Sequence, residues 1–88
     1  MQLTSEQMIP VLNRLKRARG QLTGVITMIE EGRECEDIVT QLAAVGKALD
    51  RAGYSIIAEG LRTCLAESDG ETDSLDAKKL ERVFLSMA

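Results

Sequence analysis

The sequence contains no histidine and very few aromatic residues. Without histidine the chain has neither a Ser-His nor a Cys-His catalytic pair, and every metal site that requires an imidazole ligand is excluded. Tryptophan is absent, and Phe and Tyr each occur once among 88 residues. The core therefore has to consist of Leu, Ile, Val, Ala and Met, which favours helix packing over strand pairing.

Long apolar runs are also missing. No segment approaches the roughly 20 apolar residues that span a bilayer, and Met1-Gln2-Leu3 does not begin an export signal. We therefore expect a cytoplasmic protein that contacts no membrane. In that compartment the two cysteines of the chain, Cys35 and Cys64, are expected to be thiols at rest.

The length of 88 residues suits a single domain, residues 1–88, whose core is marginal for one chain alone. We therefore expect the chain to associate with further copies. Its formal charge of −3 excludes a polycation that coats nucleic acid indiscriminately. Basic residues are nevertheless concentrated near the N-terminus, at Arg14, Lys16, Arg17 and Arg19.

Apolar residues recur at helical spacing in three segments. The first helix is predicted to begin between residues 5 and 10, at a capping box (residues 4–7) or at Pro10, and to end at Gly32. The second begins at Cys35 and continues for about nine turns, until residues 67–70 break it. Ser74 is suited to cap a third, shorter helix. The predicted fold is all-α, with a long central helix.

Both cysteines lie on one face of this long helix, together with Gly46, Gly53 and Gly60. We call this face, which also carries Leu42, Leu49 and Ile57, the cysteine face. A glycine inside a helix costs roughly 0.5–1 kcal/mol relative to alanine. Three glycines on one face therefore indicate either a close approach of another backbone or room for something bound there.

The two cysteines cannot meet within one copy of the chain. They are 29 residues apart, which is about 44 Å along a helix, whereas a disulfide requires Cα atoms within about 7 Å. If two long helices pack antiparallel, residue i faces residue 99 − i of the partner, so that Cys35 faces the partner's Cys64. The same pairing places Gly46 opposite the partner's Gly53. The alternative interpretation is that Cys64 is a small buried apolar residue and Cys35 an incidental thiol.

Several segments of the sequence closely resemble the copper-sensitive operon repressor family (CsoR/RcnR/FrmR). They are Asn13-Arg14-Leu15-Lys16-Arg17, Gly20-Gln21-Leu22-Thr23-Gly24-Val25, Met28-Ile29-Glu30-Glu31-Gly32-Arg33, Cys35-Glu36-Asp37-Ile38, Gln41-Leu42-Ala43-Ala44-Val45 and Ala48-Leu49. The resemblance covers about residues 10–66. It implies an all-α protomer, an antiparallel dimer, a tetramer built as a dimer of dimers, and a repressor that releases its operator when its thiol site is modified or filled.

The inducer is less well defined by this resemblance. Copper sensors of the family have Cys, His and Cys as ligands, and the position of the histidine is Gly60 in this sequence. Formaldehyde sensors typically have Pro after the initiator Met, where this sequence has Gln2. A dithiol without histidine is similar to the CstR branch, which senses persulfide and polysulfide, with Gly60 leaving space for additional sulfur atoms. This is the main expectation from the sequence, with no cofactor; the alternative is a copper(I) site of two thiolates, Cys35 and Cys64.

Double-stranded operator DNA is the other expected partner. Arg14 and Arg17 share a helix face, with Lys16 and Arg19 beside them, and Arg51 lies near the middle of the long helix. The family resemblance implicates the positions of Arg14 and Arg51 in operator contact. The alternative is an ordinary solvated face.

Two other function classes compete with a repressor. A thiol enzyme such as a sulfurtransferase would need a substrate cleft and an activating base, and neither is visible in the sequence. A purely structural dimerisation module would keep its partners after both cysteines were replaced. We therefore expect a repressor and not an enzyme.

Overall fold

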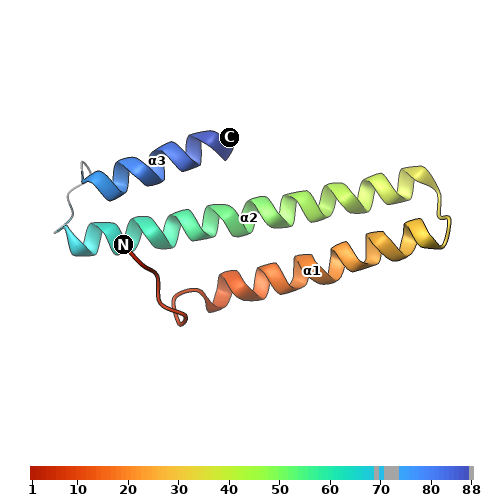
Figure 1. Cartoon of the computed structure of the whole chain (residues 1–88), viewed down its shortest axis with the longest axis horizontal. Helices are drawn as coiled ribbons and strands as arrows, with labels where there is room; N and C mark the ends of the chain where they lie inside the picture. The colour runs from red at the N-terminus through yellow and green to blue at the C-terminus, as the bar shows by residue number, and fades with distance from the viewer. Residues whose placement is uncertain (69, 71–73, 88) are drawn as a thin grey trace.

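The structure is a computed structural model, and it describes residues 1–68, 70 and 74–87. This part of the chain forms three helices and no strand: α1 (Ile9–Glu30), α2 (Cys35–Glu67) and α3 (Leu75–Met87). The long helix α2 lies between the other two and runs antiparallel to both (Figure 1). The prediction of an all-α protomer with a long central helix is confirmed.

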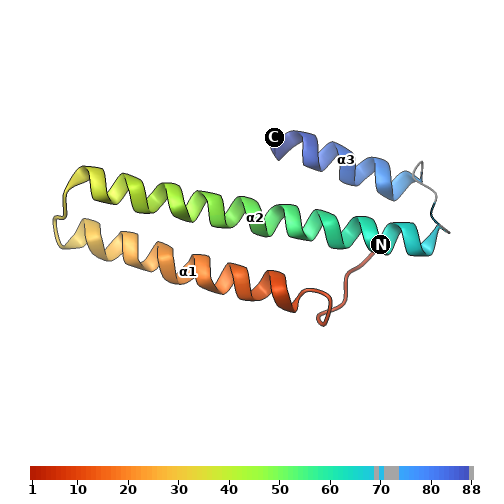
Figure 2. The ribbon, with the colours of Figure 1, turned by 180° about the vertical axis from the view of Figure 1, so that it is seen from behind.

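The molecule is elongated and flat. Its principal extents are 54 × 26 × 12 Å, so the three helices form a layer about one helix thick. Figure 2 shows from behind that the three helices lie side by side. The radius of gyration is 16.8 Å, compared with about 12 Å for a compact domain of this length. An arrangement of this shape leaves both broad faces of α1 and α2 open.

The N-terminal segment is fixed by a reciprocal capping box ahead of α1. The backbone N–H of Gln7 donates to Thr4 Oγ1 (3.1 Å), and the backbone N–H of Thr4 donates to Gln7 Oε1 (2.9 Å). Gln7 Nε2 also donates to Thr63 Oγ1 of α2 (2.8 Å). The reciprocal bonds of the predicted capping box are present, but they close a turn ahead of α1 and do not cap it. The helix starts at Ile9 with Pro10 in its first turn, as the alternative start predicted, and its N-cap Met8 makes no side-chain bond. The bond from Gln7 ties the turn to the C-terminal part of α2.

The turn between α1 and α2 contains Gly32, the glycine that was predicted to end the first helix. Gly32 has φ +70°, a conformation that side chains other than glycine rarely adopt. Its N–H donates to the carbonyl of Ile29 (3.1 Å), and the N–H of Arg33 donates to the carbonyl of Met28 (3.0 Å). These two bonds form a Schellman motif, which ends α1 and lets the chain reverse into α2.

The third helix lies on α2, and within the described residues it does not pack on α1. Its cap is the predicted one, because Ser74 Oγ accepts a hydrogen bond from the N–H of Ala77 (3.2 Å). The rings of Tyr54 and Phe84 also meet across the two helices, with centroids 5.6 Å apart. The sequence does not decide whether this helix covers its own protomer; in the structure it covers one side of α2.

The core consists of small residues spaced along the facing helices: Val11, Ala18 and Val25 of α1, Val45, Ala52 and Cys64 of α2, and Ala77 of α3. The larger residues whose spacing predicts α1 are mostly outside this core. Leu12, Leu22, Ile26 and Ile29 remain between 42% and 59% exposed. The helical prediction is correct, but this apolar stripe is left largely exposed by the residues that the structure describes, because α2 contacts the neighbouring valine and alanine face. None of the described helices is long and apolar enough to span a membrane.

Candidate functional site

Cys35 is the first residue of α2 and is exposed. The end of α2 on which it lies is acidic, because Glu34, Glu36 and Asp37 flank it. Its position follows directly from the turn at Gly32, which releases the chain from α1 three residues earlier. This thiol is open to ligands from solvent and to a neighbouring molecule.

Cys64 lies near the opposite end of α2 in a different environment. It is buried, with 2% of its surface exposed. Its Sγ is 3.0 Å from Ser74 Oγ, at the N-terminus of α3. The two cysteines of one chain therefore differ in access, one being at an open helix end and the other beneath a neighbouring helix.

The structure keeps these two thiols apart within the chain. Because α2 is continuous from Cys35 to Glu67, their separation along the helix is about 44 Å. Among the described residues, no group of three or more His, Cys, Asp or Glu side chains is arranged to hold a metal ion. Thiolates are donors that soft copper(I) prefers, so the donor type fits this ion. Two donors become available at one point only if a second copy supplies one of them.

Two of the three glycines on the cysteine face lie against side chains of α3, which the sequence did not predict. A Cβ built at Gly60 would be 3.2 Å from both δ carbons of Leu80, and one at Gly53 would be 2.5 Å from Cε of Met87. The expected free space for sulfur atoms beside Gly60 is therefore absent, because α3 of the same chain fills it. The expected contact between Gly53 and the partner's Gly46 is also wrong for this arrangement, because Met87 of α3 covers Gly53. Gly46 itself has no neighbouring atom within 4 Å of such a Cβ.

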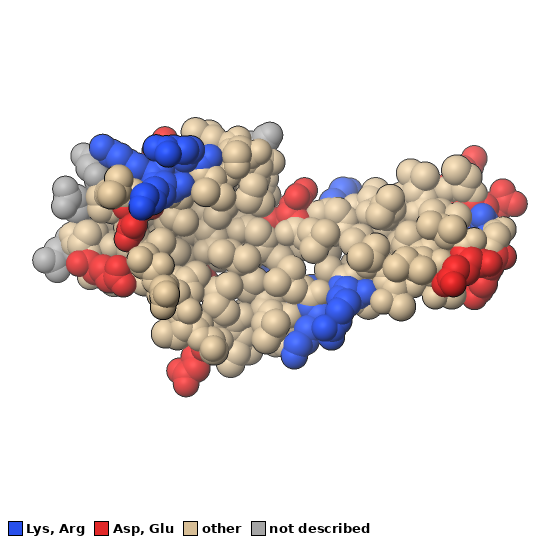
Figure 3. Space-filling model, in the orientation of Figure 1, with Lys and Arg blue, Asp and Glu red and all other residues tan. Residues whose placement is uncertain are grey.

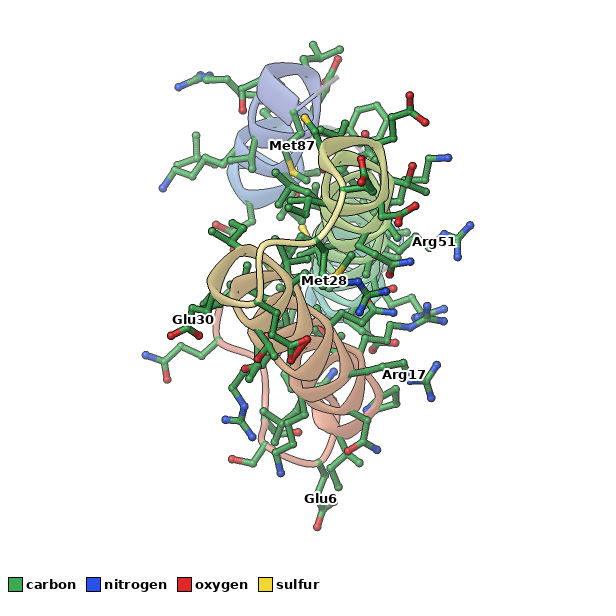
Figure 4. The ribbon with its side chains drawn as sticks, turned by 90° about the vertical axis from the view of Figure 1, so that its right-hand side faces the viewer. Glu6, Arg17, Met28, Glu30, Arg51 and Met87 are labelled. Carbon is green, nitrogen blue, oxygen red and sulfur yellow. The ribbon has the colours of Figure 1, made fainter. Side chains whose placement is uncertain are left out.

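A basic groove lies between α1 and α2, on the other side of the molecule from the face seen in Figure 1. Four cationic side chains line it, together with Gln21, Ala44 and Ala48, around a volume of about 270 Å³. The four are Arg14, Arg17, Lys47 and Arg51, and we call them the groove cations. Figure 4 shows Arg17 and Arg51 extending to the same side of the molecule. Within the part of the chain that the structure describes, none of the four forms an ion pair.

Two of the predicted basic residues are not part of this groove. Lys16 and Arg19 are exposed but do not line it, because the helical rotation places them about 200° and 140° around α1 from Arg14. Lys47 is absent from the residues predicted from the sequence. Its spacing of four residues from Arg51 on α2 is the signal that could have identified it. Figure 3 shows further basic side chains over α3 on the opposite face of the molecule, where that helix carries Lys78, Lys79 and Arg82.

The sequence profile of the metal-sensitive transcriptional repressors matches residues 8–86, which is nearly the whole chain. The chain belongs to this family. Its relatives include a copper-sensing repressor CsoR from Mycobacterium ulcerans, 46% identical over 55 residues, which cover 62% of this chain and 47% of the relative. The copper-sensing CsoR of Bacillus subtilis is 33% identical over 72 residues, covering 77% of this chain and 71% of the relative. The chain thus spans about half the length of the mycobacterial repressor.

Solved structures of this repressor family have the same fold. The copper-sensing repressor CsoR with Cu(I) from Geobacillus thermodenitrificans has a TM-score of 0.79 and 30% identity, covering 98% of this chain and 91% of that one. The nickel-responsive regulator InrS has a TM-score of 0.75 and 28% identity, covering all of this chain and 97% of that one. The agreement extends to α3, because nearly all of this chain is superposed in both cases.

These relatives correct the main expectation for the inducer. The sequence led us to expect a persulfide and polysulfide sensor of the CstR type, whereas the relatives are named copper-sensing repressors and the similar structures are a copper(I) and a nickel regulator. Persulfide sensing is therefore wrong as the main interpretation. The absence of histidine misled the inference, because a two-thiol donor set suits soft copper(I) as well as sulfur chemistry.

Proposed function

We propose that this chain is a copper(I)-responsive transcriptional repressor, which binds operator DNA as an oligomer and releases it when copper(I) bridges two thiols from different copies. The observation that carries the proposal is the placement of Cys35 and Cys64 at opposite ends of one uninterrupted helix. The names of the relatives favour copper(I) as the inducer.

Assembly is supported by the surface that one chain leaves open. The chain exposes 6573 Å², whereas a compact monomer of its mass would expose about 5,100 Å². Much of the difference is apolar, since leucine, isoleucine and valine side chains of all three helices are about half exposed. Apolar patches of this extent mark interfaces between proteins. We infer an antiparallel dimer and, from the family resemblance, a tetramer built from two such dimers.

The sensor site follows from antiparallel pairing of α2. A two-fold axis near Leu49 and Asp50 brings Cys35 of each copy to Cys64 of the other, which creates two equivalent dithiol sites. Cys35 and the partner's Cys64 would hold copper(I) there, because soft thiolates are donors that this ion prefers. Gly60, where the family's copper sensors have histidine, lies against Leu80. The sequence contains no histidine, so we expect two thiolate ligands and no imidazole.

The basic groove is the proposed DNA contact. Its four groove cations lack ion-pair partners in the described residues, which leaves their charges available to phosphates. One copy contributes too little charge for tight binding, but an oligomer repeats the groove with two-fold symmetry, which suits a palindromic operator. Lys16 and Arg19, which lie on other sides of α1, are proposed as supporting phosphate contacts in the oligomer.

The proposed dithiol site and the basic groove both include residues of α2. The long helix that carries both cysteines also carries Lys47 and Arg51, so a change in the spacing of paired α2 helices moves these cations. Bridging of the thiols is expected to fix that spacing and to lower the affinity for DNA without unfolding the protein.

The proposal is tested by selecting the bound sequences from a random DNA pool and titrating the selected DNA with the reduced protein. Copper(I) is then added under anaerobic conditions, and DNA binding is followed by fluorescence anisotropy. We expect copper(I) to lower the affinity at least tenfold for the wild-type chain and to have no effect on Cys35→Ser or Cys64→Ser variants. Equal DNA affinity with and without copper(I) would refute the proposed inducer, and absence of any DNA binding would refute the repressor function itself.

A further inference from the structure

Ser74 makes two contacts that together connect the buried cysteine with α3. Its Oγ is 3.0 Å from Cys64 Sγ and 3.2 Å from the backbone nitrogen of Ala77. The first contact reaches the thiol proposed as a copper ligand. The second is the N-cap of α3.

The direction is fixed for one of these hydrogen bonds. A backbone N–H can only donate, so the oxygen of Ser74 accepts from Ala77. Between Ser74 Oγ and Cys64 Sγ either atom can be the donor while the cysteine is a thiol, because the hydroxyl still has its own hydrogen and a second lone pair. Once this sulfur is a thiolate it can only accept, so the same geometry suits the metal-bound form.

The surroundings make this hydroxyl the polar partner of the sulfur. Cys64 is 2% exposed, and no other hydrogen bond to its sulfur is found among the residues that the structure describes. Four residues earlier, Gly60 faces the aliphatic side chain of Leu80. A buried charged sulfur needs a donor, and this side of α2 offers one, on α3.

We propose that Ser74 is a positioning residue of the copper(I) site: its hydroxyl donates to the Cys64 thiolate and fixes the orientation of the sulfur. This proposal rests on the proposed function. When copper(I) binds, the Cys64 thiol gives its proton to solvent and forms a bond from sulfur to copper, while Ser74 keeps its proton and no oxidation state changes. Donors of this kind, which orient a ligand without touching the metal, typically contribute a factor of about 10–100 to metal affinity.

The solved copper(I) repressor shares the fold over 98% of this chain, with a TM-score of 0.79. A third helix docked on α2 is therefore compatible with bound copper(I).

The test separates the cap from the hydroxyl donor by four variants. Ser74→Thr keeps both contacts, and Ser74→Ala removes both. Ser74→Asp keeps a good N-cap but presents a carboxylate, which cannot donate to the thiolate. Ser86→Asp, near the C-terminal end of α3, adds the same charge away from Cys64 and serves as the control. Copper(I) affinity is measured by competition with bicinchoninate, and stability by thermal unfolding.

We expect Ser74→Asp to bind copper(I) at least tenfold more weakly while its unfolding temperature stays near that of the wild type. Ser74→Thr and Ser86→Asp should keep wild-type affinity, and Ser74→Ala should lose both affinity and stability. If Ser74→Asp binds copper(I) as tightly as the wild type, the positioning role is refuted and the proposed function stands. A wild-type chain that binds DNA but takes up no copper(I) would refute the proposed inducer and the role of Ser74 with it.

Discussion

The antiparallel pairing of α2 can be tested through the cysteines themselves. They are about 44 Å apart along one helix, roughly six times the 7 Å that a disulfide between their Cα atoms allows. No disulfide can therefore form within a folded chain. In an antiparallel dimer each Cys35 faces the partner's Cys64, whereas in a parallel dimer each cysteine faces its own counterpart.

Single-cysteine variants distinguish these two arrangements. Each protein is treated with diamide and analysed by intact mass and by non-reducing electrophoresis. The wild type is expected to form a covalent dimer of twice the chain mass of 9.6 kDa, and neither Cys35→Ser nor Cys64→Ser alone should do so. An equimolar mixture of the two variants should again give a covalent dimer, with one bond between the remaining cysteines.

The opposite pattern would refute this reasoning. If Cys35→Ser forms a dimer through Cys64 alone, or Cys64→Ser through Cys35 alone, the helices run parallel. If the wild type forms no covalent dimer at concentrations where sedimentation shows a non-covalent one, the two sulfurs do not face each other. In either case the dithiol site would have to be abandoned.

Three further outcomes are expected. Arg14→Ala should weaken binding to all DNA sequences. It should also reduce the slope of log affinity against log salt by about 0.9 for each phosphate that the variant no longer neutralises. Lys78→Ala, on the other face, is the control and should leave the slope unchanged if the groove binds the DNA. Thr4→Ala should remove the capping box and lower the free energy of unfolding by about 1 kcal/mol, which is a fall of about 4–8 °C in melting temperature. Ser5→Ala is the control. Equal melting temperatures for Thr4→Ala and the wild type would contradict the role of the box. Gly60→Leu should lower stability by about 1–3 kcal/mol in denaturant unfolding, because its side chain meets the leucine of α3 at a well-packed point, and an unchanged stability would show that α3 is not docked there.

The helices were predictable because their ends are determined by interactions between residues close in the sequence. The Schellman turn at Gly32 and the cap at Ser74 each depend on residues within a few positions, and both appear where the sequence placed them. The long helix α2 was equally clear, since no proline interrupts it between Cys35 and Glu67. Helix boundaries of this kind depend on which residues can satisfy the free backbone N–H and C=O groups at a helix end, and these residues can be recognised in the sequence.

The packing of the helices was less predictable. Periodicity identified the apolar stripe of α1 but could not say that the smaller Val11, Ala18 and Val25 would make the contact with α2. It also could not say that α3 would cover Gly53 and Gly60, because a stripe of small residues suits any neighbouring helix. Which surface meets which depends on the relative rotation of whole helices, and one sequence does not encode that in any short segment.

The candidate sites were also predictable only in part. Arg14, Arg17 and Arg51 were identified from the sequence and lie around one groove. Lys47, one turn before Arg51 on α2, lines the same groove and was not identified. The inducer could not be derived from the residues, because two thiols without a third ligand suit both copper(I) and reactive sulfur. The relatives are named for copper, and this is why copper(I) is the proposed inducer.

The sparse interior of valines and alanines has a consequence for cells that make this protein. Because so little apolar surface is buried by one chain, the oligomer proposed above would couple folding to assembly, and the folded fraction would rise with the amount of protein synthesised. At low copy number, newly made chains would unfold and be degraded before finding a partner. Expression level thus acts as a threshold, below which the genes under the operator would stay switched on whether or not the metal is present.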